Sequence, residues 1–344
     1  MQQELFQMTD KGIYIPDADI YIDPWKPVEK SIITHGHSDH ARFGNNSYLC
    51  HHLSKPVLKY RLGEMINCCS VEYNESFTIN GIKFSLHPAG HIPGSAQIRI
   101  EKNGNVLVLS GDYKLENDFL STPFEPVKCN TFITESTFGL PIFRWKKQSE
   151  IFKDINAWWQ QNAAQNRASV LVAYSLGKAQ RLLKGLDLHN GKIFAHGAVF
   201  NMNEVLRQAG LDLPYIERIT ADTNKSEFKN AMIIAPPSAV GNPWLKKFDP
   251  YSLAFCSGWM QVRGNKRRQA IDRGFVVSDH VDWPALNEAV KLTEAEKIYV
   301  THGYTAVFVK WLRENNLDAH ELKTEFTGES IIATDDINDE KNIA

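Results

Sequence analysis

Residues 32–40 read IITHGHSDH, a short apolar run followed by three histidines and an aspartate within six positions. His35 and His37 are two residues apart on chain that leaves a strand, so both imidazoles can point to one side. Asp39 and His40 follow directly and add a carboxylate and a third imidazole. Mixed nitrogen and oxygen ligands suit zinc, manganese or iron better than the all-thiolate set of a structural zinc site. The segment therefore predicts a metal site, and the apolar strand before it argues against a histidine-rich surface loop.

Four residues from one segment cannot complete a site for two metal ions, so further ligands should follow other strands. Three candidates are present: His91 in LHPAGHIPGSAQ, Asp112 in LVLSGDYK and His302 in YVTHGY. The ends of strands are where α/β folds place their ligands. We therefore expect these three residues to join the histidine segment.

Two patterns along the chain would position these residues. The first part reads mostly as short β-branched strands separated by Gly, Pro or Asn, at 17–23, 30–34, 71–79, 82–87, 97–101 and 105–110. After this part, helices and strands alternate, with helices at 149–165 and 304–316 and strands at 169–174, 192–196, 231–235, 252–257, 274–278 and 296–303. The helix at 149–165 carries Trp158 and Trp159, of which at least one should lie in the core.

Composition narrows the class of protein. A chain of 344 residues exceeds one average core, so two domains or one domain with an insertion are expected. Its 43% hydrophobic and 23% charged residues are ordinary for a globular protein. A net charge of -2 means that a polyanion must be held by a local patch or by metal ions. No signal peptide or membrane span is expected, and five cysteines without a CxxC pair fit reduced thiols in the cytoplasm.

The order HGHSDH, AGHIPGSA and SGDYK resembles the metallo-β-lactamase superfamily. This resemblance implies an α/β fold, a four-layer αββα sandwich with two metal ions at its edge. It assigns one metal to His35, His37 and His91, the other to Asp39, His40 and His302, and a bridging position to Asp112. Asp23 in IYIDPW matches the family's early aspartate, which orients the histidine segment from behind the ligands. A plain Asp-Pro turn is the alternative for Asp23.

The long segment between TESTFG and GFVVSDH resembles the insertion of the β-CASP branch, the nucleic-acid-processing nucleases of this superfamily. Glu135, His280 and His302 match motifs A, B and C of that branch, and AYSLGKAQRLL and FCSGW are also similar to its segments. The resemblance covers about residues 13–330. It implies a sandwich domain made of 1–147 and 271–335, a β-CASP domain at 148–270 and a tail at 336–344.

The chemistry of phosphodiester hydrolysis explains these residue types independently. The reaction needs a nucleophile, neutralisation of charge on the phosphoryl oxygens and a proton for the leaving alkoxide, and two metal ions supply the first two. His280 is the candidate for the proton donor, because a neighbouring carboxylate such as Glu135 would favour the imidazolium. With the metal ligand Asp39, these form the candidate catalytic set. A helix-start carboxylate for Glu135 and a capping role for His280 are the alternatives.

Several polar residues of the inserted segment are candidate nucleic-acid contacts. Those in AYSLGKAQRLL end a strand and begin a basic helix, where amides, a hydroxyl and an ammonium can bind phosphate. FCSGW likewise ends a strand, and RGNKRRQA concentrates positive charge that could follow a nucleic-acid backbone. A plain strand-to-helix turn and a solvated helix start are the alternatives. The candidates are Ser175, Gly177, Lys178, Ser257, Gly258, Arg263, Lys266 and Arg267.

Within the branch, the whole pattern most resembles bacterial ligase-associated DNA exonucleases, through YIPDADIYIDPW, THGHSDHAR, GNPW and SGWMQVRGNKRRQAIDRGFVVSDHVDW. The resemblance implies an exonuclease that uses two Zn²⁺ or Mn²⁺ ions to hydrolyse DNA ends in repair, 5′ to 3′ and with a preference for single strands. It also implies a functional link to an ATP-dependent DNA ligase and a helicase. A ribonuclease of the same branch is the main alternative. The complete ligand set argues against an inert scaffold subunit, and the insertion argues against a small-molecule hydrolase.

Overall fold

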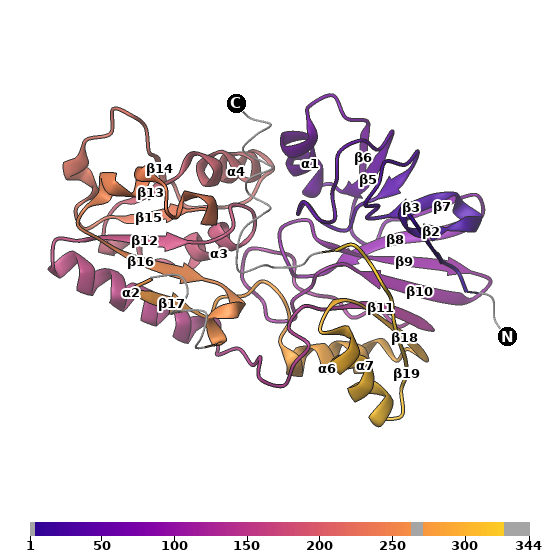
Figure 1. Ribbon diagram of the computed structural model, residues 1–344. Coiled ribbons are helices and arrows are strands. Elements are labelled where there is room, and N and C mark those ends of the chain that lie inside the picture. The colour runs from indigo at the N-terminus through magenta and orange to yellow at the C-terminus, as the bar shows by residue number, and fades with distance from the viewer. Residues whose placement is uncertain (1–3, 263–270, 327–344) are drawn as a thin grey trace. The chain divides into compact units, whose positions relative to one another are not determined.

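The computed structural model describes residues 4–262 and 271–326, which divide into two compact units (Figure 1). The first unit contains 4–144 and 280–326, and the second contains 145–262 and 271–279. The chain therefore leaves the first unit, builds the second and then returns. No helix within the described ranges is both long and apolar enough to cross a membrane.

The first unit contains two sheets. One has the order β1 (Gln7–Thr9), β2 (Gly12–Ile15), β3 (Ile20–Ile22), β4 (Ser31–Ile32), β5 (Tyr48–His51) and β6 (Cys68–Val71). The other has the order β19 (Asp318–Glu321), β18 (Lys297–Gly303), β11 (Thr131–Ser136), β10 (Asn105–Ser110), β9 (Ala96–Lys102), β8 (Ile82–Pro88) and β7 (Ser76–Ile79). In the second sheet, β10 pairs with β11, β11 with β18 and β18 with β19, and all three pairs are parallel (Figure 1). Residues distant along the chain therefore lie side by side.

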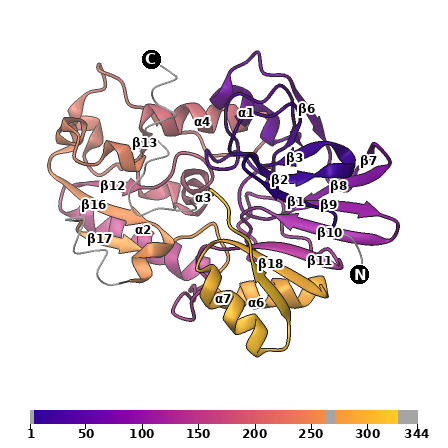
Figure 2. The ribbon, with the colours of Figure 1, turned by 45° about the vertical axis from the view of Figure 1, so that its right-hand side comes forward.

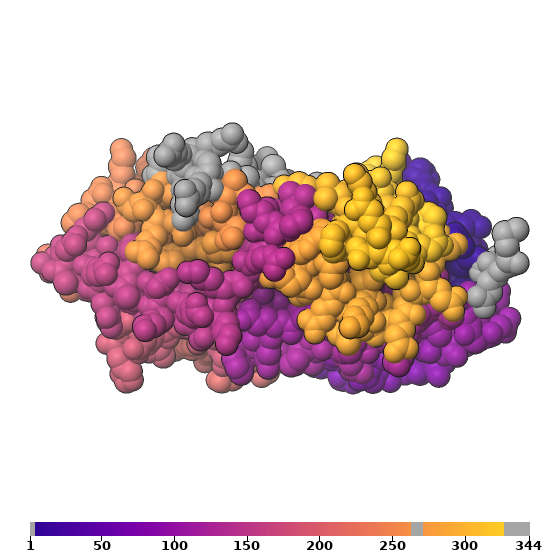
Figure 3. Space-filling model, turned by 90° about the horizontal axis from the view of Figure 1, so that it is seen from below, coloured from indigo at the N-terminus to yellow at the C-terminus, as the bar shows by residue number. Residues whose placement is uncertain are grey.

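Alternation along the strands explains how the two sheets pack. Leu107 and Leu109 of β10 join the apolar cluster between the sheets, whereas Val108 points to the opposite face. On that face it meets α6 (Trp283–Thr293) and α7 (Thr305–Glu314), which lie side by side against β18 (Figure 2). Figure 3 shows these two helices in orange and yellow at the surface of the unit. Both faces of β10 are therefore buried, which explains its continuous apolar run.

Helix α1 (Ser54–Leu62) covers the outer face of the first sheet through Leu58, which packs on Tyr48 and Cys50. The short 3₁₀ helix η1 (Pro16–Ala18) joins β2 to β3. The packing order across the first unit is thus one helix, two sheets and two helices.

The second unit is built on one parallel sheet in the order β14 (Glu217–Arg218), β13 (Ile193–Ala195), β15 (Met232–Ala235), β12 (Ala168–Val172), β16 (Tyr251–Cys256) and β17 (Arg273–Phe275). One face packs on α2 (Gln148–Ala164), α3 (Lys178–Gly185) and α4 (Gly197–Gln208). The other face packs largely on 3₁₀ segments. These are η3 (Lys225–Phe228), η5 (Pro243–Phe248) and η6 (Gly258–Gln261). The unit also contains the 3₁₀ helices η2 (Leu188–Asn190) and η4 (Pro237–Ala239).

The expected elements agree with this structure where the apolar pattern is long. The helices predicted at 149–165 and 304–316 correspond to α2 and α7, and Trp158 and Trp159 are both buried. The prediction at 71–79 is wrong as one strand, because a turn at 72–75 separates β6 from β7. The prediction at 274–278 is too long, since β17 ends at Phe275.

The cluster between the two sheets should dominate the stability of the first unit. Phe84 is fully buried there, so Phe84→Ala should reduce the free energy of unfolding by about 3–5 kcal/mol through lost burial and a cavity. Urea unfolding measures this change. Phe43→Ala is the matched control, because Phe43 is 74% exposed and its loss should change stability by less than about 0.5 kcal/mol. Equal effects of the two substitutions would contradict the packing described here.

Candidate metal centre and catalytic pair

The candidate ligands converge at one edge of the first unit, because each lies at or just after the end of a strand. The histidine segment follows β4, and the other residues follow or end strands of the second sheet. These are His35, His37, Asp39 and His40 after β4, His91 after β8, Asp112 after β10 and His302 in β18, and the catalytic candidate Glu135 lies in β11 at the same edge. The parallel pairing of β10, β11 and β18 brings their carboxyl ends to the same edge.

Four of these residues form a first group. One ligand atom from each of His35, His37, His91 and Asp112 lies within 4.8 Å of the others. The Oδ2 atom of Asp112 is 3.4 Å from Nε2 of His35 and 3.7 Å from Nε2 of His91. His91 Nε2 is also 3.0 Å from His37 Nδ1. Three imidazoles and one carboxylate oxygen therefore face a common point.

Asp112 also belongs to a second group with His40 and His302, whose ligand atoms again lie within 4.8 Å of one another. Its Oδ1 atom is 2.9 Å from His302 Nε2, and its Oδ2 atom is 3.8 Å from His40 Nε2. Asp39 Oδ2 lies 3.8 Å from the same nitrogen of His40. One carboxylate thus connects the two groups.

Asp23 holds His40 from behind. Its Oδ2 atom is 2.7 Å from His40 Nδ1, and its Oδ1 atom accepts a 2.7 Å hydrogen bond from the backbone N–H of Thr34. Asp23 is fully buried, with a left-handed φ of 44°. With Nδ1 donating to the carboxylate, His40 presents Nε2 to the ligand groups. This arrangement is the orienting contact expected for Asp23.

Two threonines of the site were missed by the sequence analysis. Thr34 Oγ1 lies 3.1 Å from Nδ1 of His35, and Thr301 Oγ1 lies 3.1 Å from Nδ1 of His302. Both pairs belong to a THG sequence, so the recurrence of THG was the available signal. At Gly111, a Cβ atom would lie 2.4 Å from Thr34 Oγ1, so only glycine allows this approach next to Asp112.

The electrostatics of the two groups suit a cation. Burial lowers the pKa of His35 and His91 well below its ordinary value, so these imidazoles are neutral. Burial also opposes charge on His40, but Asp39, Asp112 and Asp23 outweigh it and raise its pKa to about 10. The neutral imidazoles are in the form that binds metal, whereas the proton on His40 would leave when a cation enters.

Two buried imidazole nitrogens show whether these residues suit a metal ion. Nε2 of His35 and Nε2 of His40 are both inaccessible to solvent and make no hydrogen bond to the described residues. A buried polar atom without a partner carries a desolvation cost that a bound ion would remove. Nitrogen and oxygen donors in this number suit a divalent transition metal. The residues therefore could hold such ions.

Glu135 and His280 form a pair next to the first group. Nδ1 of His280 lies 3.1 Å from both carboxylate oxygens of Glu135. Glu135 is fully buried, and Oε1 also accepts a 3.0 Å hydrogen bond from the backbone N–H of Tyr113. The rings of His280 and His91 are 4.7 Å apart between centroids. The carboxylate therefore fixes an imidazole at the border of the ligand cluster.

The candidate nucleic-acid contacts of the second unit that the structure describes are mostly buried or hydrogen-bonded within the chain. Ser175 is buried, and the Gly177 N–H donates a 2.8 Å hydrogen bond to the side chain of Gln180. Lys178 is also fully buried, and its Nζ atom lies 3.2 Å from Asp279 Oδ1. A phosphate-binding role for Lys178 does not match this position, since its ammonium is already paired with a carboxylate away from solvent.

Ser257 caps η6, because its hydroxyl accepts a 3.1 Å hydrogen bond from the N–H of Trp259, and Gly258 is buried. Arg263, Lys266 and Arg267 lie outside the described residues. Phosphate binding by these residues, and by Ser175 and Gly177, stays a prediction.

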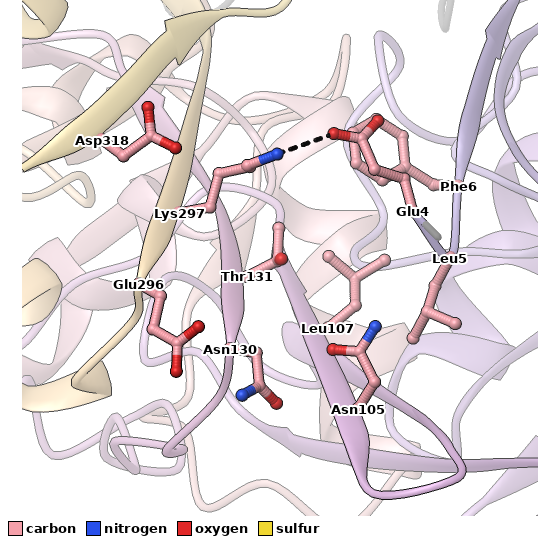
Figure 4. A pocket seen from close by; sticks show the side chains of 10 residues that line it. All are labelled: Glu4, Leu5, Phe6, Asn105, Leu107, Asn130, Thr131, Glu296, Lys297 and Asp318. Atoms are coloured by element: carbon pink, nitrogen blue, oxygen red, sulfur yellow. Dashed lines mark hydrogen bonds and ion pairs between the residues drawn. The ribbon is translucent and has the colours of Figure 1, made fainter. Parts of the chain in front are cut away.

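A cavity of about 500 Å³ lies at the amino-terminal ends of the parallel strands of the second sheet (Figure 4). Asn105, Thr131 and Lys297, which begin β10, β11 and β18, line it, and Lys297 pairs with Glu4 at 3.2 Å. The candidate ligands follow the opposite ends of these strands. This cavity is therefore not part of the metal centre.

Comparison with known proteins identifies relatives of the whole chain and of parts of it. No family model matches. A protein named "Probable DNA ligase" from Opitutus terrae is 28% identical over 90% of this chain and 30% of its own length. "Endoribonuclease YSH1" from Gibberella zeae is 28% identical over 65% of this chain and 27% of its own length. The chain thus spans about a third or less of these relatives.

Shorter matches include "Cleavage and polyadenylation specificity factor subunit 3" from Dictyostelium discoideum, 31% identical over 34% of this chain and 15% of that protein. Among solved structures, a protein of unknown function from Enterococcus faecalis superposes with a TM-score of 0.59 at 13% identity. This match covers 86% of this chain and 79% of the other, and it supports a shared fold.

The cluster should bind divalent metal ions in solution. His35→Ala removes one fully buried imidazole from it, so the dialysed variant should retain less zinc or manganese per chain than the unaltered protein. Inductively coupled plasma mass spectrometry gives this ratio. His189→Ala is the control, since His189 is exposed and belongs to none of the ligand groups described here. Equal metal content in all three proteins would exclude His35 as a ligand.

Proposed function

We propose that this chain, whose resemblance to the β-CASP branch of the metallo-β-lactamase superfamily is confirmed by its relatives, is a two-metal phosphodiesterase that acts on nucleic acid. The observation that carries the proposal is the His280–Glu135 pair beside a buried cluster of imidazoles and carboxylates. In this proposal the first unit is the four-layer αββα sandwich, and the second unit is the inserted β-CASP domain. The chain would act in the cytoplasm.

The proposed metal ligands divide into two sets that share Asp112. His35, His37 and His91 would hold one ion, and Asp39, His40 and His302 would hold the other. Divalent ions bound there would supply an activated water and neutralise charge on the phosphoryl oxygens. Asp23, Thr34 and Thr301 keep the ligand imidazoles oriented.

His280 is the proposed general acid. Its Nδ1–H donates to Glu135, whose negative charge stabilises the protonated imidazole. The proton on the other ring nitrogen can then pass to the oxygen of the leaving nucleoside, so that an alcohol rather than an alkoxide departs. Glu135 is held in turn by the backbone N–H groups of Tyr113 and Thr137. In this proposal the pair supplies a proton to the leaving group and belongs to neither of the two ligand sets.

DNA is the proposed substrate, cleaved from its ends with 5′ to 3′ polarity and a preference for single strands. Two observations support it: the motif pattern of ligase-associated exonucleases, and similarity over 90% of the chain to part of a protein named as a probable DNA ligase. The same relative supports a functional link to an ATP-dependent DNA ligase, and a helicase is a further proposed partner. RNA is the second candidate, because other relatives are named endoribonucleases.

Labelled substrates distinguish these possibilities. We expect mononucleotides to be released from 5′-labelled single-stranded DNA in the presence of Mn²⁺ or Zn²⁺, with slower cleavage of an RNA of matching sequence. Gel electrophoresis of 5′- and 3′-labelled strands shows both the polarity and the substrate. Faster cleavage of RNA would favour the second candidate, and internal cuts throughout the DNA would exclude an exonuclease.

The general acid can be separated from the metal ligands. His280→Ala should reduce kcat by about 10² to 10⁴-fold and leave the bound metal unchanged, because His280 donates a proton and is not a ligand. Asp39→Ala should lose one of the two metal ions and nearly all activity. Steady-state cleavage and metal analysis of each variant test this, with His189→Ala as the control. Loss of metal from His280→Ala would instead make His280 a ligand.

A further inference from the structure

The end of the described chain returns to the metal centre. After β19, the backbone N–H of Leu322 donates a 2.9 Å hydrogen bond to the carbonyl of Val300 on β18. Four residues later, the ring of Phe326 lies face to face with His40, at 4.4 Å between centroids and an interplanar angle of 11°. The same ring meets His302 edge-on at 5.6 Å and Trp25 edge-on at 5.8 Å. No sequence motif indicated Phe326.

Arg42, two residues after His40, fixes this segment. Its guanidinium donates a 3.2 Å hydrogen bond to the carbonyl of Trp25 and another, also of 3.2 Å, to the carbonyl of Glu325. The guanidinium is also 4.0 Å from the Glu325 carboxylate. Trp25, which is buried, follows the turn that carries Asp23. One turn thus positions both the carboxylate behind His40 and the aromatic neighbour of Phe326.

The contact with Phe326 restricts the plane of the His40 ring, which the hydrogen bond between His40 and Asp23 does not fix. A hydrogen bond to Nδ1 fixes that atom, but the plane of the imidazole can still swing about it. A second ring parallel to the imidazole at van der Waals distance restricts this motion. His35 makes another ring contact with His40, at 4.2 Å between centroids. The direction of His40 Nε2 therefore depends on both the hydrogen bond and the neighbouring rings.

We propose that Phe326 is a positioning residue for the metal position formed by Asp39, His40 and His302. Its ring fixes the plane of His40, contacts the edge of His302 and keeps water from that side of the ligands. This inference rests on the proposed two-metal assignment, because it names a residue outside the motifs on which one of the two metal positions depends. The other position, which uses His37 and His91, makes no ring contact with Phe326 among the described residues.

Cobalt titration of the metal-free protein tests the proposal without measuring cleavage. We expect two binding steps in the unaltered protein, followed by the visible absorption of Co²⁺. Phe326→Ala should weaken one step by about 10 to 100-fold, the range found when groups that orient metal ligands are removed, and change the visible spectrum. The other step should keep its affinity. Phe326→Tyr and Phe326→Trp retain a planar ring and should restore the affinity and the spectrum.

Phe119→Ala is the matched control, because Phe119 is 79% exposed and its removal should leave both steps unchanged. Circular dichroism and thermal unfolding of metal-free Phe326→Ala establish that the variant folds. If it fails to fold, the same titration of Phe326→Leu, which keeps much of the apolar volume but not the planar ring, replaces it. Unchanged affinities and an unchanged spectrum in the folded variant would overturn the proposal, as would equal weakening of both steps.

Failure of this inference and failure of the proposed function give different results. If the unaltered protein binds two Co²⁺ ions, shows the Phe326 effect and cleaves neither DNA nor RNA, the positioning role holds and the nuclease assignment is wrong. If the protein cleaves nucleic acid and Phe326→Ala binds Co²⁺ like the unaltered protein, the reverse is true. Binding of a single Co²⁺ ion by the unaltered protein would overturn both the two-metal assignment and this inference.

Discussion

The site depends on one buried carboxylate. Asp112 has ligand atoms of two histidine groups on its two oxygens, so neither group is complete without it. Burial by itself would raise the pKa of this carboxyl group, but the surrounding imidazoles, with His280 and His40 foremost, outweigh burial and hold the pKa well below its ordinary value. The negative charge is therefore present at neutral pH in an environment from which water is excluded. A divalent cation held by these residues would compensate this charge.

The packing of the two sheets brings residues from both of them to Asp112. The histidine segment follows the first sheet, whereas Asp112 follows the second, and the apolar cluster between the sheets sets the distance between them. Gly111 allows the two segments to approach, since any side chain at this position would overlap Thr34. The core is thus responsible for the geometry of the site, and substitutions far from the ligands can alter it.

The sequence indicated the candidate ligand segments because their residue types and the apolar strands before them are local patterns, and the structure brings these residues together, whereas their binding of metal stays a prediction. His91, Asp112 and His302 could be named for the same reason. Contacts that depend on tertiary packing were not accessible: Phe326 reaches His40 from a distant part of the chain, and no local pattern marks it. Strands β5 and β6 were missed because their sequences, YLCH and CCSV, contain only one β-branched residue between them. Lys178 was assigned to phosphate from its place at a helix start, but burial and Asp279 decide its environment instead.

The pairing of β11 with β18 has a consequence for the synthesis of the protein. Residues 131–136 lie next to residues 297–303 in the finished sheet, and the whole second unit is translated between them. The ribosome therefore makes most of the ligand set long before His302 and Phe326 emerge from the exit tunnel. Because long-range parallel pairing forms slowly, β18 and its His302 can join the second sheet only after the whole second unit has been made.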